Sequence, residues 1–295
     1  VRVQVGPPKL SKPPSRWLFL LIATLCEEMF SMNYAVKDIL AKIDQMAPFD
    51  LQEEWDNSGL ILGDPQCMVK GVVVALDLTV EVIEKAHELK ANLVITHHPP
   101  ILSPIKCWDT SNYAESLFYK AAHDNLNLIA VHTNLDVSYN GINVALAEAI
   151  EITDFKPLSE GPEEAFGLGA WGYMKREVSR EELAKILNAA WQIPWIAFYG
   201  EKKRFKTIAL CGGSGGNLWI NAANFNVDLY ITADMKYHQI AEAQQRLNIA
   251  LVDHGQMERS GLSKFIKDLQ QSLEIQVHDL TDIKVYSPPR IISFD

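Results

Sequence analysis

The chain has 295 residues, 48% of them hydrophobic, with a formal net charge of -10 at pH 7 and a pI of about 5.3. This length is enough for two globular domains, and an acidic chain with only the short basic cluster Lys202 to Arg204 lacks the patch that nucleic-acid binding requires. Its four cysteines are scattered without a Cys-x-x-Cys pair, so we expect no disulfide scaffold and no zinc ribbon, and a cytoplasmic location.

Residues 1–31 differ in composition from the rest of the chain. Four prolines and several basic residues precede an apolar run at residues 17–25. That run is too short to span a bilayer and has no clear small-x-small cleavage site, so we expect no membrane partner. We interpret residues 1–31 as an N-terminal extension that is disordered or comes from an over-extended gene start. An uncleaved targeting segment is the alternative.

Strands and helices alternate along residues 32–158. The apolar runs 72–76, 93–96 and 128–131 predict short buried strands. Helical spacing of apolar residues at 80–89, 113–125 and 141–150 predicts amphipathic helices between and after them. Strand, helix and strand in this order indicate parallel strands joined by crossover helices.

The same order recurs in residues 159–295, after a polar Gly/Pro linker at 159–162. Strands are expected at 169–174 and 196–199, around a helix at 181–191 that Ser179 caps with Glu182 in a capping box. Further strands are expected at 208–211, 229–232 and 249–252, with helices at 218–225 and 237–246. The sequence thus predicts an α/β fold of two similar lobes, 32–158 and 159–295, with mixed sheets flanked by helices and related by an internal repeat.

Metal-ligating residue types follow the predicted strands. His97 and His98 end one strand, and a segment from His132 to Asp136 ends the next. Superposing the two halves of the repeat puts that segment opposite residues 253–258, which contain His254 and Glu258. Ligands of α/β sheets gather at the carboxyl ends of the strands. We therefore expect these side chains to converge in one crevice.

The expected metal ligands are His97, His98, Asp136, His254 and Glu258. Three imidazoles and two carboxylates are too many for one tetrahedral zinc and suit two divalent ions, which could be zinc, iron, manganese, cobalt or nickel. Glu258 is the candidate bridge between them. For a lone histidine, an ordinary polar residue at a strand end would be the better interpretation.

His132 and the glycine turn at residues 212–216 are not expected to bind metal. We expect His132 to support a metal ligand through a hydrogen bond rather than to bind metal itself. The glycine turn 212–216 lacks the Gly-Lys-Ser/Thr ending of a P-loop, so we expect a tight turn between strand and helix, with phosphate contact as the alternative.

From Met32 to about its end, the chain resembles the Nif-three-like family, also described as GTP cyclohydrolase I type 2 homologues. The motifs that carry the resemblance are residues 54–60 (Glu-Trp-Asp-Asn-Ser-Gly-Leu), 96–99 (Thr-His-His-Pro), 132–136 (His-Thr-Asn-Leu-Asp), the glycine turn, and His254 followed by Glu258. The resemblance implies a two-lobed α/β chain with a dinuclear metal centre at the five residues named above. It also implies a toroidal homohexamer.

The resemblance further implies a hydrolase with a small-molecule substrate, in which metal-activated water opens the imidazole ring of the guanine of GTP, or attacks a related heterocycle, and formate is lost. Glu258 and His238 are the candidate catalytic residues. His238 would deliver a proton to the leaving nitrogen, because imidazole titrates near neutral pH, although an ordinary helix histidine is the alternative. A metal-binding or regulatory scaffold without turnover is the alternative function.

Overall fold

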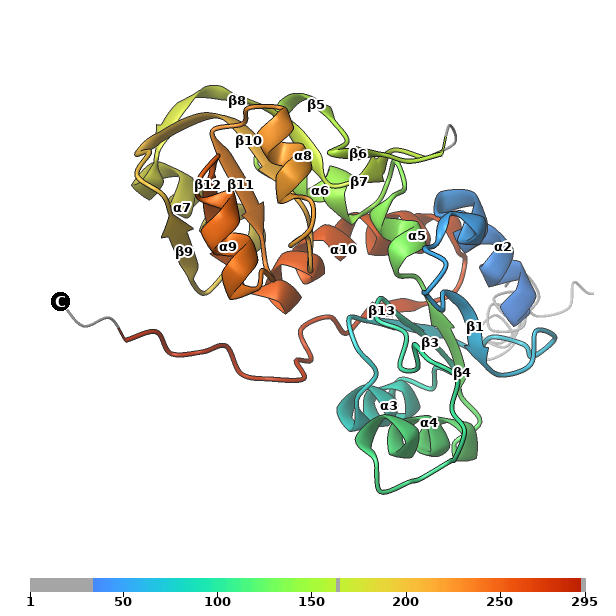
Figure 1. Ribbon diagram of the computed structural model, residues 1–295. Coiled ribbons are helices and arrows are strands. Elements are labelled where there is room, and N and C mark those ends of the chain that lie inside the picture. The colour runs from blue at the N-terminus through green and yellow to red at the C-terminus, as the bar shows by residue number, and fades with distance from the viewer. Residues whose placement is uncertain (1–33, 163–164, 293–295) are drawn as a thin grey trace, which may run out of the picture. The chain divides into compact units, whose positions relative to one another are not determined.

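Two mixed β-sheets form the framework of the chain (Figure 1). In the first sheet the strand order is β1-β4-β3-β2-β13, with β1 antiparallel to β4 and the other neighbours parallel. The bounds are β1 Gly59–Leu62, β2 Val72–Ala75, β3 Leu93–Thr96, β4 Asn127–Ala130 and β13 Val277–Asp279. Strands β2, β3 and β4 are buried throughout, as their apolar runs predict for parallel strands covered on both faces.

The computed structural model describes residues 34–162 and 165–292. The extension expected at residues 1–31 lies outside the described residues. None of the described helices is long and apolar enough to cross a membrane.

The second sheet has the order β5-β8-β10-β11-β12-β9. Its three parallel strands β10, β11 and β12 lie between antiparallel β8 on one side and antiparallel β9 on the other. The bounds are β5 Thr153–Lys156, β8 Ala170–Ser179, β9 Ile196–Tyr199, β10 Arg204–Leu210, β11 Leu229–Thr232 and β12 Asn248–Val252. A small hairpin of β6 (Ser159–Glu160) and β7 (Gly167–Leu168) completes the strands.

The two sheets share one topological unit, which confirms the predicted fold class and internal repeat. Strands β2, β3 and β4 with antiparallel β1 beyond β4 correspond to β10, β11 and β12 with antiparallel β9 beyond β12. The chain does not divide between the sheets at a single point, because β13 pairs with β2 and β5 pairs with β8. The division into lobes at residues 158 and 159 stays a prediction.

Two helices cover one face of each sheet (Figure 1). On the first sheet these are α3 (Val80–Glu88) and α4 (Tyr113–His123), and on the second they are α8 (Trp219–Asn224) and α9 (Tyr237–Ala243). In the core beneath α3 and α4, Val82, Ile83 and Leu117 pack with Val73 and Val94 of the first sheet. In the core beneath α8 and α9, Trp219 and Ala222 pack with Ala209 and Tyr230 of the second sheet.

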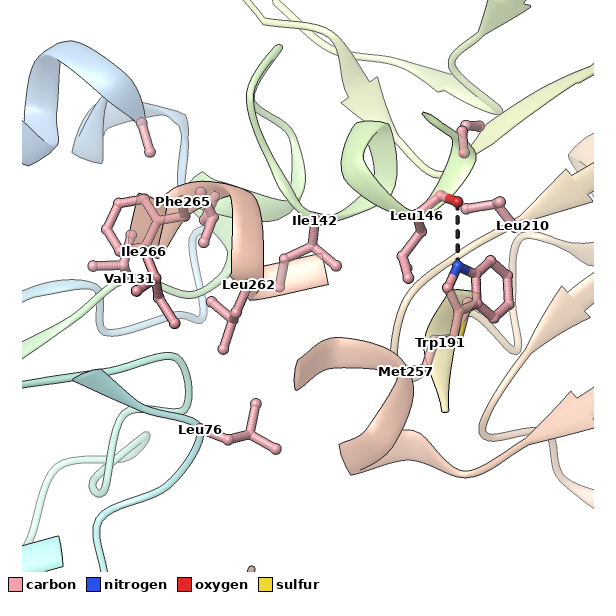
Figure 2. Close-up of a cluster of buried hydrophobic side chains, with 14 of the residues drawn as sticks. Leu76, Val131, Ile142, Leu146, Trp191, Leu210, Met257, Leu262, Phe265 and Ile266 are labelled. Carbon is pink, nitrogen blue, oxygen red and sulfur yellow. Dashed lines mark hydrogen bonds between the residues drawn. The ribbon is translucent and has the colours of Figure 1, made fainter. Parts of the chain in front are cut away.

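The opposite faces of both sheets belong to one continuous core. The helices that fill it are α2 (Val36–Met46), α6 (Ile142–Ala149), α7 (Arg180–Trp191) and α10 (His254–Ser272). The predicted capping box of α7 is present, because Ser179 and Glu182 exchange both hydrogen bonds. Figure 2 shows Leu262, Phe265 and Ile266 of α10 in this core with Val131, and Trp191 donating its indole N–H to the Leu146 carbonyl at 3.3 Å.

Helix α10 is therefore held along its length by apolar contacts. Its buried residues recur from Met257 to Leu269, and Gly261 leaves room for Ile142 of α6 to approach closely. A helix packed in this way cannot shift without disrupting the core. Its first turn, which contains His254 and Glu258, is consequently a rigid platform for these two side chains.

Candidate metal centre

The first group of polar side chains lies where β3 and β4 end. His97 and His98 follow β3 directly, and His132 stands just before the short helix α5 (Thr133–Asp136), which Asp136 ends. Because β3 and β4 are parallel neighbours, these ends lie at the same edge of the sheet. The His pair and Asp136 are thus brought together by strand order.

The second group lies where β12 ends and α10 begins. Asp253 is the N-cap of α10, and its carboxylate accepts a hydrogen bond of 2.8 Å from the Gln256 amide. His254 and Glu258, four residues apart, project from one face of the first turn. Glu258 is almost fully buried, with 5% of its surface exposed.

The two groups meet at Glu258. The Nε2 atoms of His98 and His254 each lie 3.0 Å from its Oε2 atom. Nε2 of His97 lies 3.8 Å from Oε1 of Glu258 and 3.9 Å from Oδ1 of Asp136. All five residues that the sequence analysis selected as ligands therefore lie in one cluster.

Each imidazole of the cluster has its Nδ1 atom bound to a fixed acceptor. The pairs are His97 with the Val131 carbonyl at 2.8 Å, His98 with Asp77 at 2.7 Å, His132 with Asp56 at 2.7 Å and His254 with Asp234 at 2.6 Å. Since carbonyl and carboxylate oxygens accept, each Nδ1 carries a hydrogen, and a neutral ring then has its lone pair on Nε2. Histidines that bind metals are oriented in this way.

Two buried atoms of the cluster lack a partner among the described residues. They are Nε2 of His97 and Oε2 of Glu258, neither of which makes a hydrogen bond. The imidazoles beside Oε2 are close enough, but their geometry is not that of a hydrogen bond. Buried polar atoms are nearly always satisfied, and a missing ion is a known reason for exceptions. A divalent cation fits this donor set.

The ligand atoms form two groups that could each hold a metal ion. One group is His98, His254 and Glu258, and the other is His97, His98 and His132, with all ligand atoms of a group within 4.8 Å of one another. His132 is thus placed closer to a ligand position than the sequence analysis expected. Asp136 stands beside His97 but outside both groups.

The electrostatics of the cluster favour positive charge. Burial lowers the pKa values of His98 and His254, but Asp77, Asp234 and Glu258 outweigh it and raise both pKa values to about 10. Burial raises the pKa of Asp136. Without bound metal, the carboxylates attract protons onto the imidazoles, and metal ions can supply the same charge.

A cavity of about 520 Å³ opens above the cluster. His98, His132, His254, Asp136 and Glu258 all line it, together with the apolar side chains of Trp55, Leu102, Leu168 and Leu218. A small organic molecule could therefore reach any metal held at the cluster.

His238 does not join this arrangement. Its side chain is exposed near the start of α9, its ring contacts Tyr237 with centroids 5.2 Å apart, and it is absent from the cavity lining. A proton donor must come within hydrogen-bond reach of the reacting atom. The proposed role of His238 therefore has no geometric support.

The carboxylates behind the imidazoles were not among the site residues predicted from the sequence. Asp77 follows β2 by two residues, so the rule that selected the histidines at strand ends would also have selected it. Asp56 belongs to a loop and is held by Thr133, Ser58 and the Asn57 amide, in addition to His132. The predicted tight turn at residues 212–216 is present between β10 and α8.

Comparison with known proteins supports the resemblance seen in the sequence. A family model described as Duf34/NIF3 (NGG1p interacting factor 3) matches residues 34–286. A Campylobacter jejuni protein named GTP cyclohydrolase 1 type 2 homolog is 34% identical over 244 residues, covering 82% of this chain and 94% of that protein.

Solved structures show the same fold. The Staphylococcus aureus protein SA1388 has a TM-score of 0.78 at 26% identity, covering 88% of this chain and 99% of that one. A Bacillus cereus protein related to NIF3 has a TM-score of 0.80 at 21% identity, covering 89% of this chain and all of that one. With a family model matching most of its length, the chain belongs to the Duf34/NIF3 family.

Proposed function

We propose that the chain binds two divalent metal ions at this cluster and uses them to hydrolyse a C–N bond of a heterocyclic small molecule. The observation that carries the proposal is a cluster of four imidazoles with Nδ1 anchored and two carboxylates, of which three imidazoles and both carboxylates line a cavity. Sites that only stabilise a fold are usually closed by protein ligands, whereas catalytic sites remain open to substrate.

Glu258 is the residue best placed to be shared by two ions. Its Oε2 atom faces His98 and His254, and its Oε1 atom is the one nearer to His97. Asp136 would complete the set on the His97 side. Nitrogen and oxygen ligands in this mixture suit zinc, iron, manganese, cobalt or nickel.

When bound, two such ions would lower the pKa of water toward neutrality and stabilise negative charge on the oxygen of the attacked carbon. The residues of the chain supply position and proton transfer. The Asp56 carboxylate fixes the His132 ring by accepting a hydrogen bond from its Nδ1 atom, and His132 is one of the residues that line the cavity. His132 is therefore our candidate for passing a proton to the leaving nitrogen.

The names of relatives suggest a substrate class, GTP or a related heterocycle. For a guanine ring the oxygen of water would bond to the imidazole-ring carbon, one C–N bond would break, and the proton would pass to the released nitrogen. A second water would then release that carbon as formate. Both steps consume only water.

The first experiment is elemental analysis of purified protein after dialysis. We expect about two metal equivalents per chain, and loss of most metal in His97→Ala and Glu258→Ala, with folding checked by circular dichroism. His123→Ala is the matched control, since that histidine is exposed on α4. Full metal retention in both site variants would reject the cluster as the metal site.

Turnover is tested separately on the metal-loaded protein. Guanine compounds, including GTP, are incubated with loaded and with metal-stripped protein, and formate and the ring-opened product are measured. Metal-dependent formate release would support the hydrolase. Two bound metals without turnover of any compound would favour a metal-binding scaffold.

A further inference from the structure

Apart from the imidazoles that would hold the metal, the ionisable side chains that line the cavity are carboxylates and one buried thiol, that of Cys211. The carboxylates are Glu53, Asp136 and Glu258, and the lining within the described residues includes neither lysine nor arginine. We propose that the substrate of this site is a planar heterocycle that carries no phosphate groups, such as a free base or a nucleoside. The proposal rests on the proposed function and narrows its substrate class.

Bound metal would not reverse this charge balance. Asp136 and Glu258 lie in the cluster, and Asp56, Asp77 and Asp234 stand directly behind its imidazoles. These five carboxylates offset the charge of two divalent ions. A triphosphate entering the cavity would give up hydration without gaining the cationic side chains that usually hold phosphates.

A neighbouring hollow of about 380 Å³ is the obvious alternative place for phosphates, because the glycine turn and Lys236 border it. Four of its polar side chains are already paired. Ser214 donates to Asp234 at 2.8 Å, and the Gln239 side chain donates to that of Asn217 at 2.8 Å. One exposed lysine beside Asp234 does not make a site for several negative charges.

The apolar part of the lining fits a flat ring. Trp55 is 59% exposed and Leu102 is 48% exposed, although both line the cavity. The Trp55 ring meets the His132 ring nearly at right angles, with centroids 5.9 Å apart. An exposed tryptophan beside a polar cluster offers a broad surface against which a heterocycle can stack.

Glu53 adds a selective polar group. The Glu53 amide donates to the Thr133 hydroxyl at 3.0 Å, which fixes residue 53 beside the site. Its exposed carboxylate has no ion-pair partner among the residues that the structure describes. A free carboxylate accepts hydrogen bonds from ring N–H and amino groups and repels phosphate. It would favour a base with such donors on its edge.

The test compares guanosine with GTP on the metal-loaded protein by titration calorimetry. We expect guanosine to bind at least about tenfold more tightly, with the difference shrinking at high salt because exposed charges are screened. Glu53→Gln should weaken this discrimination severalfold. Glu54→Gln is the matched control, since the neighbouring carboxylate is exposed but does not line the cavity. Metal content is measured again after each titration, because a triphosphate can remove metal.

Two results would overturn the proposal. One is GTP binding as tightly as guanosine or more tightly with both metals retained, and the other is no detectable guanosine binding. The first result would reject the proposed substrate class without contradicting the proposed hydrolysis. Failure of the proposed hydrolysis would be seen in the turnover assay instead, where metal-loaded protein that binds guanosine would release no formate from any compound.

Discussion

Gly213 lies against the carboxylate of Glu258. Its backbone has φ +62, and a Cβ atom placed there would overlap Oε1 of Glu258 and lie 3.3 Å from Nε2 of His254. The glycine turn therefore comes so close to the cluster that no larger residue fits without moving the Glu258 carboxylate.

We expect Gly213→Ala to weaken metal binding at least about tenfold, because the Glu258 carboxylate must move away from its position between the imidazoles. The left-handed backbone conformation adds a stability cost of about 1 kcal/mol. Metal affinity is measured by competition with a chromogenic chelator, and stability by thermal unfolding of the metal-free protein.

Gly59→Ala is the control that separates the cost of a positive φ from the overlap of a Cβ atom with a neighbouring side chain. Gly59 also has a positive φ, +118, but a Cβ atom there would meet nothing within 4 Å. This variant should lose stability and keep its metal. Equal metal affinity in both glycine variants would contradict the assigned contact.

A second prediction concerns the carboxylate behind His98. Asp77→Asn keeps an acceptor for Nδ1 but removes the charge that makes the imidazole a stronger ligand. Loss of such a supporting carboxylate typically costs about 10- to 100-fold in metal affinity, without abolishing binding. Asp109→Asn is the control, because Asp109 is exposed and bonds only its near neighbour Ser111. Unchanged affinity in Asp77→Asn would show that His98 is not a ligand.

The cluster could be predicted from the sequence because its side chains obey simple rules of sheet geometry. His97, His98 and Asp136 follow adjacent parallel strands, and the repeat put His254 and Glu258 at the matching place in the second half. The pattern of strand ends, together with its repetition, was therefore enough to select them. It was not enough for His132, whose ring orientation is set by Asp56, a residue 76 positions earlier in the chain.

Other features had no local signal at all. Strand β13 has three residues and gains its place by pairing with β2, about 200 residues away along the chain, so no periodicity could reveal it. His238 was selected because it follows a strand of the repeat, yet it falls on the exposed side of α9. Whether a helix residue faces a cavity depends on packing that its own sequence does not contain.

A third prediction concerns Tyr286 in the segment after β13. Its hydroxyl donates to Asp253 at 3.1 Å and accepts from the Gly255 amide at 3.3 Å, so it holds the first turn of α10 on both sides of His254. Tyr286→Phe should cost about 1 kcal/mol of stability, as expected for lost hydrogen bonds, and should weaken metal retention severalfold. Tyr237→Phe is the control, because Tyr237 is 78% exposed. Wild-type metal affinity in Tyr286→Phe would limit this tyrosine to a structural role.

The last prediction concerns the pH dependence of the metal-free protein. The pKa values of His98 and His254 are raised from an ordinary 6.5 to about 10 by the surrounding carboxylates, after burial has acted in the opposite direction. A raised pKa stabilises the folded state fully below pH 6.5 and loses that contribution as the pH rises toward 10.

Denaturant unfolding in excess chelator should therefore give a free energy of unfolding that falls between these two pH values. His98→Ala should flatten the fall, whereas His123→Ala, on the outer surface of α4, should not. Metal-loaded protein should respond in the opposite direction and lose stability as the pH is lowered, because protons compete with metal for the Nε2 atoms. A metal-free protein whose stability rises from pH 6.5 to 10 would mean that the imidazoles of the cluster are not held in their charged form by Asp77, Asp234 and Glu258.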